Sequence, residues 1–302
     1  MQYLITGGAG FIGANLTRYL IDQGHSVRIF DNFAAGRFPE RLDNRAEYIE
    51  GSILDRENLR KACEGIDGIF HLAALPRVSY SVEHPLETHD VNLTGLLYVL
   101  EAARAAKVKR LVFSSSSAAW GDQSEYPVPD TAIPRPISPY GFHKLAGEHY
   151  CRIWSRLYGL ETVSLRYFNI YGPFMDPHGA YALVIGKFIW QKKQGEPLTI
   201  CGDGEYFRDY THVSDVARAN LLAMTKDSVG QGEVIEIGGG NPCSVNALAK
   251  LIGGETTSIP PRAADMRFTK ANTTKAKELL GWEPEVKLID GVQRLREEWG
   301  VT

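Results

Sequence analysis

The chain contains little cysteine and no long apolar run. Its four cysteines lie far apart and lack the paired spacing of a zinc site, so we expect reduced thiols and no metal. No apolar stretch approaches the length of a membrane span, and Met1 leads almost directly into a predicted strand rather than into a signal peptide. We therefore expect no membrane partner and a cytoplasmic location.

The chain also has no large excess of charge of either sign. The formal net charge is −3 and the pI is near 6.3, so there is no general basic surface and we expect no nucleic-acid partner. Any anionic ligand must then be bound by local cations. With 302 residues and 44% hydrophobic content, the chain can form one large α/β domain and a smaller lobe.

Glycine is plentiful near the N-terminus, where residues 1–31 predict a dinucleotide site. A short apolar strand leads into Gly7, Gly10 and Gly13, and the residues that follow have the spacing of a helical face. Such a turn can bring backbone N–H groups against a pyrophosphate. The next strand ends at Asp31, whose carboxylate can bind ribose hydroxyls but would repel a 2′-phosphate, so NAD is predicted rather than NADP. The alternative is that these glycines only make tight turns.

Predicted strands and helices alternate through the first half of the chain, which favours a doubly wound parallel sheet. After the first two strands we expect strands at 46–50, 68–72, 110–113 and 161–167, and helices at 55–63, 85–107 and 138–158. Beyond residue 172 the alternation fades. We predict an α/β Rossmann domain over 1–170, rejoined by 210–238, and a second, smaller C-terminal substrate lobe formed by 171–209 and 239–302.

Ligands of such sheets bind beyond the carboxyl ends of the strands. Four segments are predicted to lie there: the glycine turn, Ala73–Ala74, Ser114–Ser117 and Asn169. We therefore expect the chemistry of the protein at these four places.

Tyr140 and Lys144 are four residues apart near the start of a predicted helix and project from one face. A tyrosine that acts as a base needs its pKa lowered by about three units from about 10, or roughly 4 kcal/mol. An ammonium about 5 Å away supplies about 3 kcal/mol at an effective dielectric near 20, so Lys144 can provide most of this. Ser116 can hold the substrate oxygen while Tyr140 takes its proton. Taken singly, the stretch with Tyr140 and Lys144 also fits an ordinary helix start, and the serine run with Ser116 also fits a flexible turn.

Four motifs together resemble one family: GGAGFIG, FSSSSAAWGD, SPYGFHK and LRYFNIYGP. They are similar to those of extended short-chain dehydrogenase/reductases that act on nucleotide sugars, and above all to the UDP-sugar 4-epimerases. The resemblance implies a catalytic triad of Ser116, Tyr140 and Lys144. It implies NAD contacts at Gly7, Gly10, Phe11, Ile12, Gly13, Asp31, Asn32, Ser52, Ile53, Ala73, Ala74, Asn92, Ser114, Tyr140 and Lys144. It implies UDP-sugar contacts at Ser116, Asn169, Lys187, Arg208, Arg262, Asp265 and Thr269.

The chain departs from the pattern of these relatives at several positions. Ser52 replaces a usual Asp, and Trp120 replaces a usual Tyr. Relatives that dehydrate or decarboxylate the sugar carry carboxylates directly after the catalytic hydroxyl, where this chain has Ser117 and Ala118. Without such a carboxylate, only oxidation and re-reduction at carbon 4 remain, which predicts epimerisation.

The sugar is predicted from one position. In relatives restricted to UDP-glucose and UDP-galactose a tyrosine lies four residues past the Asp of an Arg-x-x-Asp motif, and here that position is Thr269. A smaller residue favours UDP-N-acetylglucosamine and UDP-N-acetylgalactosamine, alongside UDP-glucose and UDP-galactose. A UDP-uronic acid is the rival, with Arg77 as its partner, although relatives that use uronates have their Arg at the position of Ser79.

Two further alternatives follow from the same motifs. A binding protein that senses NAD or a nucleotide sugar without turnover would share the fold. The resemblance also implies a homodimer that pairs through the helices predicted at 85–107 and 138–158. Four histidines lack the spacing of metal ligands, and we interpret them as packing or surface residues: His71, His143, His149 and His212.

Overall fold

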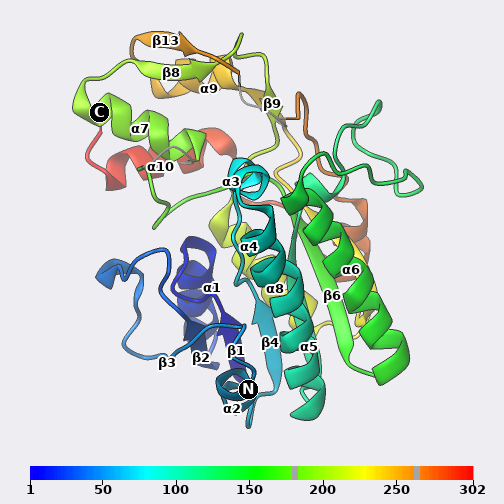
Figure 1. The fold of residues 1–302 in the computed structure, drawn as a ribbon. Helices are drawn as coiled ribbons and strands as arrows, with labels where there is room; N and C mark the ends of the chain where they lie inside the picture. Colours follow the sequence, from blue (N-terminus) through cyan, green and yellow to red (C-terminus); the bar gives the residue numbers. More distant parts are fainter. Residues whose placement is uncertain (179–182, 262–265, 302) are drawn as a thin grey trace.

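The computed structural model describes residues 1–178, 183–261 and 266–301. Its centre is a parallel sheet of seven strands in the order β11-β6-β5-β4-β1-β2-β3 (Figure 1). The predicted Rossmann fold is therefore confirmed. The strands are β1 (Gln2–Thr6), β2 (Ser26–Asp31), β3 (Glu47–Glu50), β4 (Gly68–His71), β5 (Arg110–Ser116), β6 (Glu161–Tyr167) and β11 (Gln231–Ile237).

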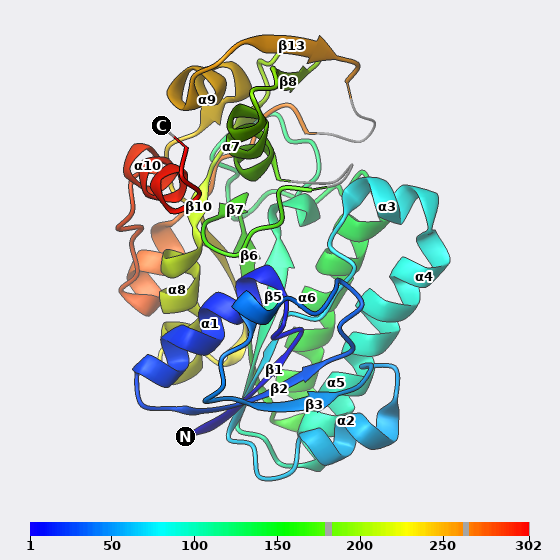
Figure 2. The same cartoon turned by 90° about the vertical axis from the view of Figure 1, so that its left-hand side faces the viewer.

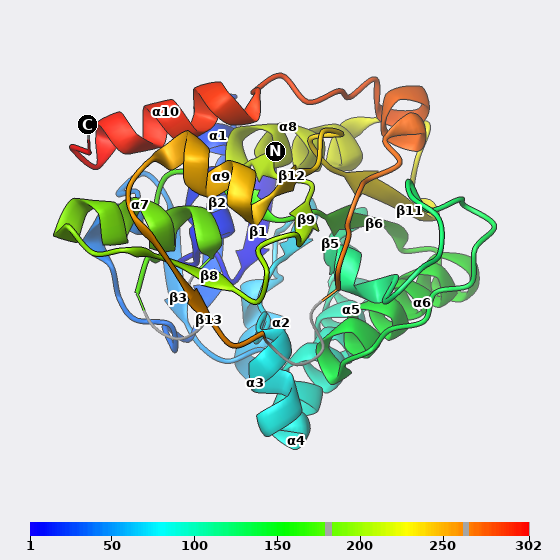
Figure 3. The ribbon, with the colours of Figure 1, turned by 90° about the horizontal axis from the view of Figure 1, so that it is seen from above.

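Each face of the sheet carries its own core, because successive side chains of a strand point to opposite faces. Ile5 packs with α1 (Phe11–Asp22) and α8 (Val213–Thr225) in one core. Leu4 packs in the other with α2 (Arg56–Ala62), α5 (Gly95–Ala105) and α6 (Pro139–Tyr158). Figure 3 shows α1 and α8 on one side of the sheet and α5 and α6 on the other. This burial on both faces explains why the strands read as continuous apolar runs.

The segment predicted as one helix at 85–107 is helical from Pro85 to Ala105 but contains a π-helical turn. It forms α4 (Pro85–His89), the π-helical turn at Asp90–Thr94 and then α5, and a separate helix, α3 (Val78–Glu83), precedes it. Within this turn, Asn92 is buried and its side-chain amide exchanges hydrogen bonds with the backbone of Leu75. A π-turn widens the helix by one residue, a local change that apolar spacing does not reveal.

The later part of the chain forms a smaller unit beyond the carboxyl ends of the strands (Figure 2). Its core contains Phe188, Leu198, Leu248 and Val292. Its elements are β7 (Ile170–Tyr171), α7 (Val184–Gln194), β8 (Leu198–Cys201), β9 (Phe207–Arg208), β10 (Thr211–His212), β12 (Cys243–Ser244), α9 (Val245–Ile252), β13 (Thr256–Ile259) and α10 (Leu288–Glu298). In the described residues no helix is both long enough and apolar enough to cross a membrane.

Candidate active site

The glycine turn between β1 and α1 leaves no room for side chains. Gly7 has a φ of 75°, and a Cβ on Gly13 would lie 2.5 Å from the Gly7 carbonyl oxygen. The N-cap of α1 is Gly10, which has no side chain to cap the first turn, so its N–H groups face an open cradle. Phe11 and Ile12 supply two of them. The cradle fits the pyrophosphate of a dinucleotide.

Asp31 ties the end of β2 to this turn. Its two carboxylate oxygens accept hydrogen bonds from the backbone N–H groups of Ala9 at 3.0 Å and Phe33 at 2.8 Å. Burial raises the pKa of the carboxyl group, and these two hydrogen bonds lower it. Each oxygen keeps a second acceptor position, so the carboxylate can still bind the ribose hydroxyls that the sequence predicted.

The remaining cofactor residues predicted from the sequence follow other strand ends. Ala73 lies against Gly7, and its N–H is 3.4 Å from the Thr6 hydroxyl; Ala74 follows it. The side-chain oxygen of Asn32 accepts a hydrogen bond from the backbone N–H of Ala34, and the Ser52 hydroxyl accepts one from the backbone N–H of Leu54. The buried side chain of Ile53 packs under Gly95. Asn92 holds the loop after Ala74 in place.

Ser116 and Tyr140 meet at the start of α6, where the Ser116 hydroxyl lies close enough to lower the pKa of Tyr140. Ser138 caps this helix by accepting from the Gly141 N–H at 3.1 Å, and Pro139 occupies its first turn. Gly141 is required here, because a Cβ would lie 2.4 Å from the carbonyl oxygen of Ala118. The turn after Ser116 is thus pressed directly against the helix that carries Tyr140.

Lys144 lies one helical turn below Tyr140 and is buried. Its Nζ donates to the carbonyl oxygen of Ser114 at 2.6 Å and lies 5.7 Å from the centroid of the Tyr140 ring. Burial lowers the pKa of Lys144 to about 8. Burial also raises the pKa of Tyr140, and the nearby Ser116 hydroxyl lowers it. Lys144 is not among the groups that shift this pKa, so the expected lowering of the tyrosine pKa by Lys144 stays a prediction.

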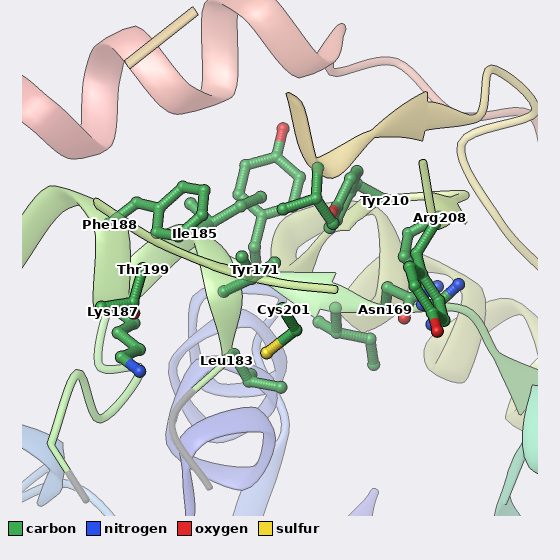
Figure 4. A pocket seen from close by; sticks show the side chains of 14 residues that line it. Asn169, Tyr171, Leu183, Ile185, Lys187, Phe188, Thr199, Cys201, Arg208 and Tyr210 are labelled. Carbon is green, nitrogen blue, oxygen red and sulfur yellow. The ribbon is translucent and has the colours of Figure 1, made fainter. Parts of the chain in front are cut away.

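A cavity of about 220 Å³ opens in the smaller unit, lined by residues of β7, α7, β8 and β9. Figure 4 shows Lys187 extending from α7 on one side, with Arg208 on the other beside Asn169. These three predicted substrate residues therefore share one cavity. Its other lining residues are Ile170, Tyr171, Leu183, Val184, Ile185, Phe188, Thr199, Cys201, Tyr206, Tyr210 and Val245. Arg262 and Asp265, also predicted as substrate residues, lie outside the described residues.

Asn169 lies at the cavity, directly beyond the strand that pairs with the predicted catalytic residue Ser116. It follows β6, whose Tyr167 is the register partner of Ser116. Its backbone is left-handed, with a φ of 34°, and its side-chain Nδ2 donates to the Asp209 carbonyl at 3.1 Å and to the Thr269 hydroxyl at 3.2 Å. Thr269 is 3% exposed and is not among the described residues that line the cavity.

Trp120, which departs from the family pattern, takes a structural position. The Trp120 indole is buried and donates a hydrogen bond to the Glu236 carboxylate on β11. Burial raises the pKa of Glu236 to about 7. Trp120 does not line the cavity of about 220 Å³ in the part of the chain that the structure describes. Its indole instead joins the turn after Ser116 to the edge strand of the sheet.

Sequence reasoning missed a buried group beside the catalytic residues. Glu148 lies on α6, four residues after Lys144, and its carboxylate contacts Ser115 and Arg166. The signal was present in the sequence, because a glutamate at this spacing falls on the helix face that turns towards the sheet. Its partners could not be identified, since they lie on other elements.

The four histidines occupy separate surroundings. His71 shares a hydrogen bond of 2.7 Å with Thr6, and burial lowers its pKa to about 3. Burial lowers the pKa of His143 to about 4, with His89 and Lys144 adding to the effect. His149 is exposed on α6, and His212 caps α8. Among the described residues there is no group of three or more candidate ligands that could hold a metal ion.

Comparisons with known proteins agree with this geometry. The model of the NAD dependent epimerase/dehydratase family matches residues 3–238. The structure of a Thermotoga maritima UDP-glucose 4-epimerase with UDP-glucose is similar, with 42% identity, a TM-score of 0.94 and 99% of both chains covered.

Two further solved structures extend the range of sugars among the relatives. A Methanobrevibacter ruminantium UDP-N-acetylglucosamine 4-epimerase in complex with UDP-N-acetylmuramic acid is 32% identical, with a TM-score of 0.92 and coverage of 99% and 97%. A Bacillus cereus UDP-glucuronic acid 4-epimerase with UDP-glucuronic acid and NAD is 32% identical, with a TM-score of 0.89 and 98% of both chains covered.

Proposed function

The chain belongs to the NAD-dependent epimerase/dehydratase family, in which it is an NAD-dependent UDP-sugar 4-epimerase, and from this premise we propose that it interconverts UDP-N-acetylglucosamine and UDP-N-acetylgalactosamine. The observation that carries the reaction type is the Ser116 hydroxyl beside Tyr140, with the buried Lys144 one turn away. Turnover of UDP-glucose and UDP-galactose is expected alongside.

The side chains of this site would accept and return one proton, that of the sugar 4-hydroxyl. Bound NAD would accept a hydride from carbon 4 of the sugar and later return it. Tyr140 would take the proton of the 4-hydroxyl and give it back, while Ser116 holds the same oxygen. Lys144, charged below its pKa of about 8, would stabilise the tyrosinate. The 4-keto sugar must turn over between the two steps.

Epimerisation is favoured over elimination because the turn after Ser116 carries no acid. Ser117 and Ala118 form this turn, and the carboxylates that related dehydratases place there are missing from the sequence. Ala118 uses its N–H to donate to the Ser116 hydroxyl at 3.2 Å and its carbonyl to contact α6. Neither residue can remove a proton from carbon 5.

We assign the UDP diphosphate to the cavity of about 220 Å³. Lys187 and Arg208 bring two cations to a protein whose net charge is −3, and Asn169 adds a side-chain amide. A guanidinium fork binds two phosphate oxygens at once. The predicted partners Arg262 and Asp265 would complete this site.

The preference for N-acetylated sugars rests on Thr269. Its hydroxyl is 3.2 Å from the side-chain nitrogen of Asn169, so a larger residue at this position would extend towards the cavity. We expect Thr269→Tyr to abolish turnover of UDP-N-acetylglucosamine and to spare UDP-glucose. Thr269→Ser keeps the hydroxyl and the small volume, and it should behave like the wild type on both.

Each protein is incubated with NAD and one UDP-sugar, and the products are separated by chromatography. Wild-type turnover of UDP-N-acetylglucosamine by Thr269→Tyr would show that Thr269 does not select the sugar. Equal losses on both sugars would instead place its effect on Asn169.

The same assay distinguishes the two alternative functions. UDP-glucuronic acid is a substrate of the Bacillus cereus relative, and turnover of this sugar alone would favour the uronate reading. A protein that only senses NAD or a nucleotide sugar would turn over none of them, and Tyr140→Phe would then equal the wild type.

We also propose a homodimer formed through α4 and α6. Leu86 on α4 is 81% exposed, and Phe142 and Leu157 on α6 are 54% and 70% exposed. Figure 1 shows both helices on the same outer surface of the molecule. Large apolar side chains gathered on one surface are typical of a protein interface.

A further inference from the structure

Glu148 is a buried carboxylate in line with the catalytic residues. Tyr140, Lys144 and Glu148 follow one another at intervals of four along α6, so they lie on one face of this helix. Glu148 is 3% exposed. A buried carboxylate is retained only where charges and hydrogen bonds satisfy it.

Glu148 contacts the two strands on which the site is built. Its Oε1 accepts from the Ser115 hydroxyl at 2.5 Å and from Arg166 Nε at 2.7 Å, and its Oε2 accepts from Arg166 Nη2 at 2.7 Å. Ser115 on β5 and Arg166 on β6 are direct register partners. One carboxylate therefore fastens the ends of both strands to α6.

This clamp bears on Ser116 through the chain itself. Ser116 is the next residue after Ser115, and its hydroxyl must stay close to Tyr140. Ser114, on the other side, accepts from Lys144 through its carbonyl. Three successive serines thus connect β5 to three side chains of one helix.

We propose that Glu148 is a positioning residue for the catalytic set: it clamps Ser115 and Arg166 to α6, fixes Ser116 against Tyr140, and places a negative charge one helical turn from Lys144. This inference rests on the proposed function, because it assumes that Ser116, Tyr140 and Lys144 perform the reaction.

The charge surrounding Lys144 supports the second part of this role. Burial lowers the pKa of Lys144, and Glu148 is the main group that opposes this fall. The other ionisable groups around Lys144 are His71 on β4, Tyr167 on β6 through Ser114, and Tyr140, His143 and Cys151 on α6. Removal of the carboxylate should therefore lower the pKa of Lys144 further.

A purely structural role is the alternative, because the buried pair of Glu148 and Arg166 could simply stabilise the fold. Glu148→Gln alone leaves Arg166 buried without its partner, so its unfolding would prove nothing. The double variant Glu148→Gln with Arg166→Met removes both charges, and such replacements are often tolerated. Ser115→Ala removes only the clamped hydroxyl and keeps the charge.

The experiment measures kcat and KM of the NAD-loaded enzyme on a UDP-sugar that the wild type turns over, from pH 6 to pH 9.5. If Lys144 must be charged, kcat falls as pH rises through its pKa. In the double variant we expect this alkaline limb to move down by about one pH unit. In Ser115→Ala we expect kcat to fall about 10-fold or more, with KM unchanged and the limb in place.

Glu148→Asp keeps the negative charge on a side chain that is shorter by one methylene. The alkaline limb should therefore stay where the wild type has it, while kcat should remain below the wild-type value. If the alkaline limb of the double variant lies at the wild-type pH, the proposed effect of the Glu148 charge on Lys144 is wrong. If Ser115→Ala has the wild-type kcat, the proposed positioning of Ser116 through Ser115 is wrong. Failure of the wild type on every UDP-sugar would contradict the proposed function instead, and the two failures are therefore distinct.

Discussion

Asn169 combines a backbone and a side-chain requirement at one position. Its left-handed φ of 34° is tolerated by asparagine and glycine better than by other residues. Its amide holds the segment of Asp209 and Thr269 beside the cavity. These two requirements can be separated by substitution, because glycine satisfies only the first.

We expect Asn169→Gly to raise KM for the UDP-sugar about 10-fold, since it loses an amide whose hydrogen bonds are worth about 1 kcal/mol each. The two lost hydrogen bonds, to Asp209 and Thr269, should also lower its free energy of unfolding by about 2 kcal/mol. Asn169→Ala should show the same KM and a further loss of about 1–2 kcal/mol of stability, because its Cβ strains the left-handed backbone. Equal melting temperatures for the two variants would contradict the backbone argument.

A residue's role could be predicted where a short stretch of sequence marks it, but not where it depends on contacts between distant segments. Roles for Gly7, Tyr140 and Lys144 could be predicted from the sequence because the motif that marks each lies within one turn or one helical repeat. Thr269 could be named but not placed, because its hydrogen bonds join it to Asn169, 100 positions earlier in the chain. The contacts of Glu148 depend on the register of β5 and β6, which no sequence spacing encodes.

At the scale of elements, Arg110 holds the end of α8 against the sheet. Its guanidinium is 3% exposed and donates to four backbone carbonyls and to the Glu161 carboxylate. The carbonyls belong to Ala223, Met224, Lys226 and Val229. One side chain therefore replaces the hydrogen bonds that a helix C-terminus lacks.

We expect Arg110→Met to lower the free energy of unfolding by at least about 3 kcal/mol, because buried carbonyls lose their donor and Glu161 loses its partner. Arg104→Met is the matched control. It breaks the exposed pair with Glu101 on α5 and the contact of the guanidinium with the Tyr158 ring, and it should cost about 1 kcal/mol or less. Urea titrations give both values, and similar losses in the two variants would contradict this role.

Helix and strand positions were predictable where the apolar pattern is set within the element. The π-turn within the helix predicted at 85–107 was not, because it follows from the fit of Asn92 to the loop at Leu75. Residues 210–238, which contain β11, were expected to rejoin the first domain, but nothing in this segment indicates that β11 pairs with β6 rather than with β3 at the other edge.

At the scale of the whole molecule, the apolar surface of α4 and α6 predicts the oligomeric state. Light scattering at micromolar concentration should give twice the chain mass of 33.5 kDa. Leu157→Glu places a charge in the proposed interface and should give the monomer mass. A monomeric wild type would dispose of the proposal.

Ile289→Glu provides the matched control for this experiment. Ile289 is 58% exposed on α10, and Figure 3 shows α10 on the opposite side of the molecule from α6. This variant should keep the mass of the wild type. A mass change in both variants would indicate a general loss of structure rather than a disrupted interface.

The late arrival of β11 has a consequence for synthesis of the protein. β6 ends at Tyr167, but its edge partner begins at Gln231, more than 60 residues later. At translation rates of about 5–20 residues per second, the nascent chain presents an open strand edge for roughly 3–13 s. Such an edge can pair with a neighbouring nascent chain on the same messenger RNA. Slow codons between these two strands should therefore increase aggregation, whereas slow codons after Ile237 should not.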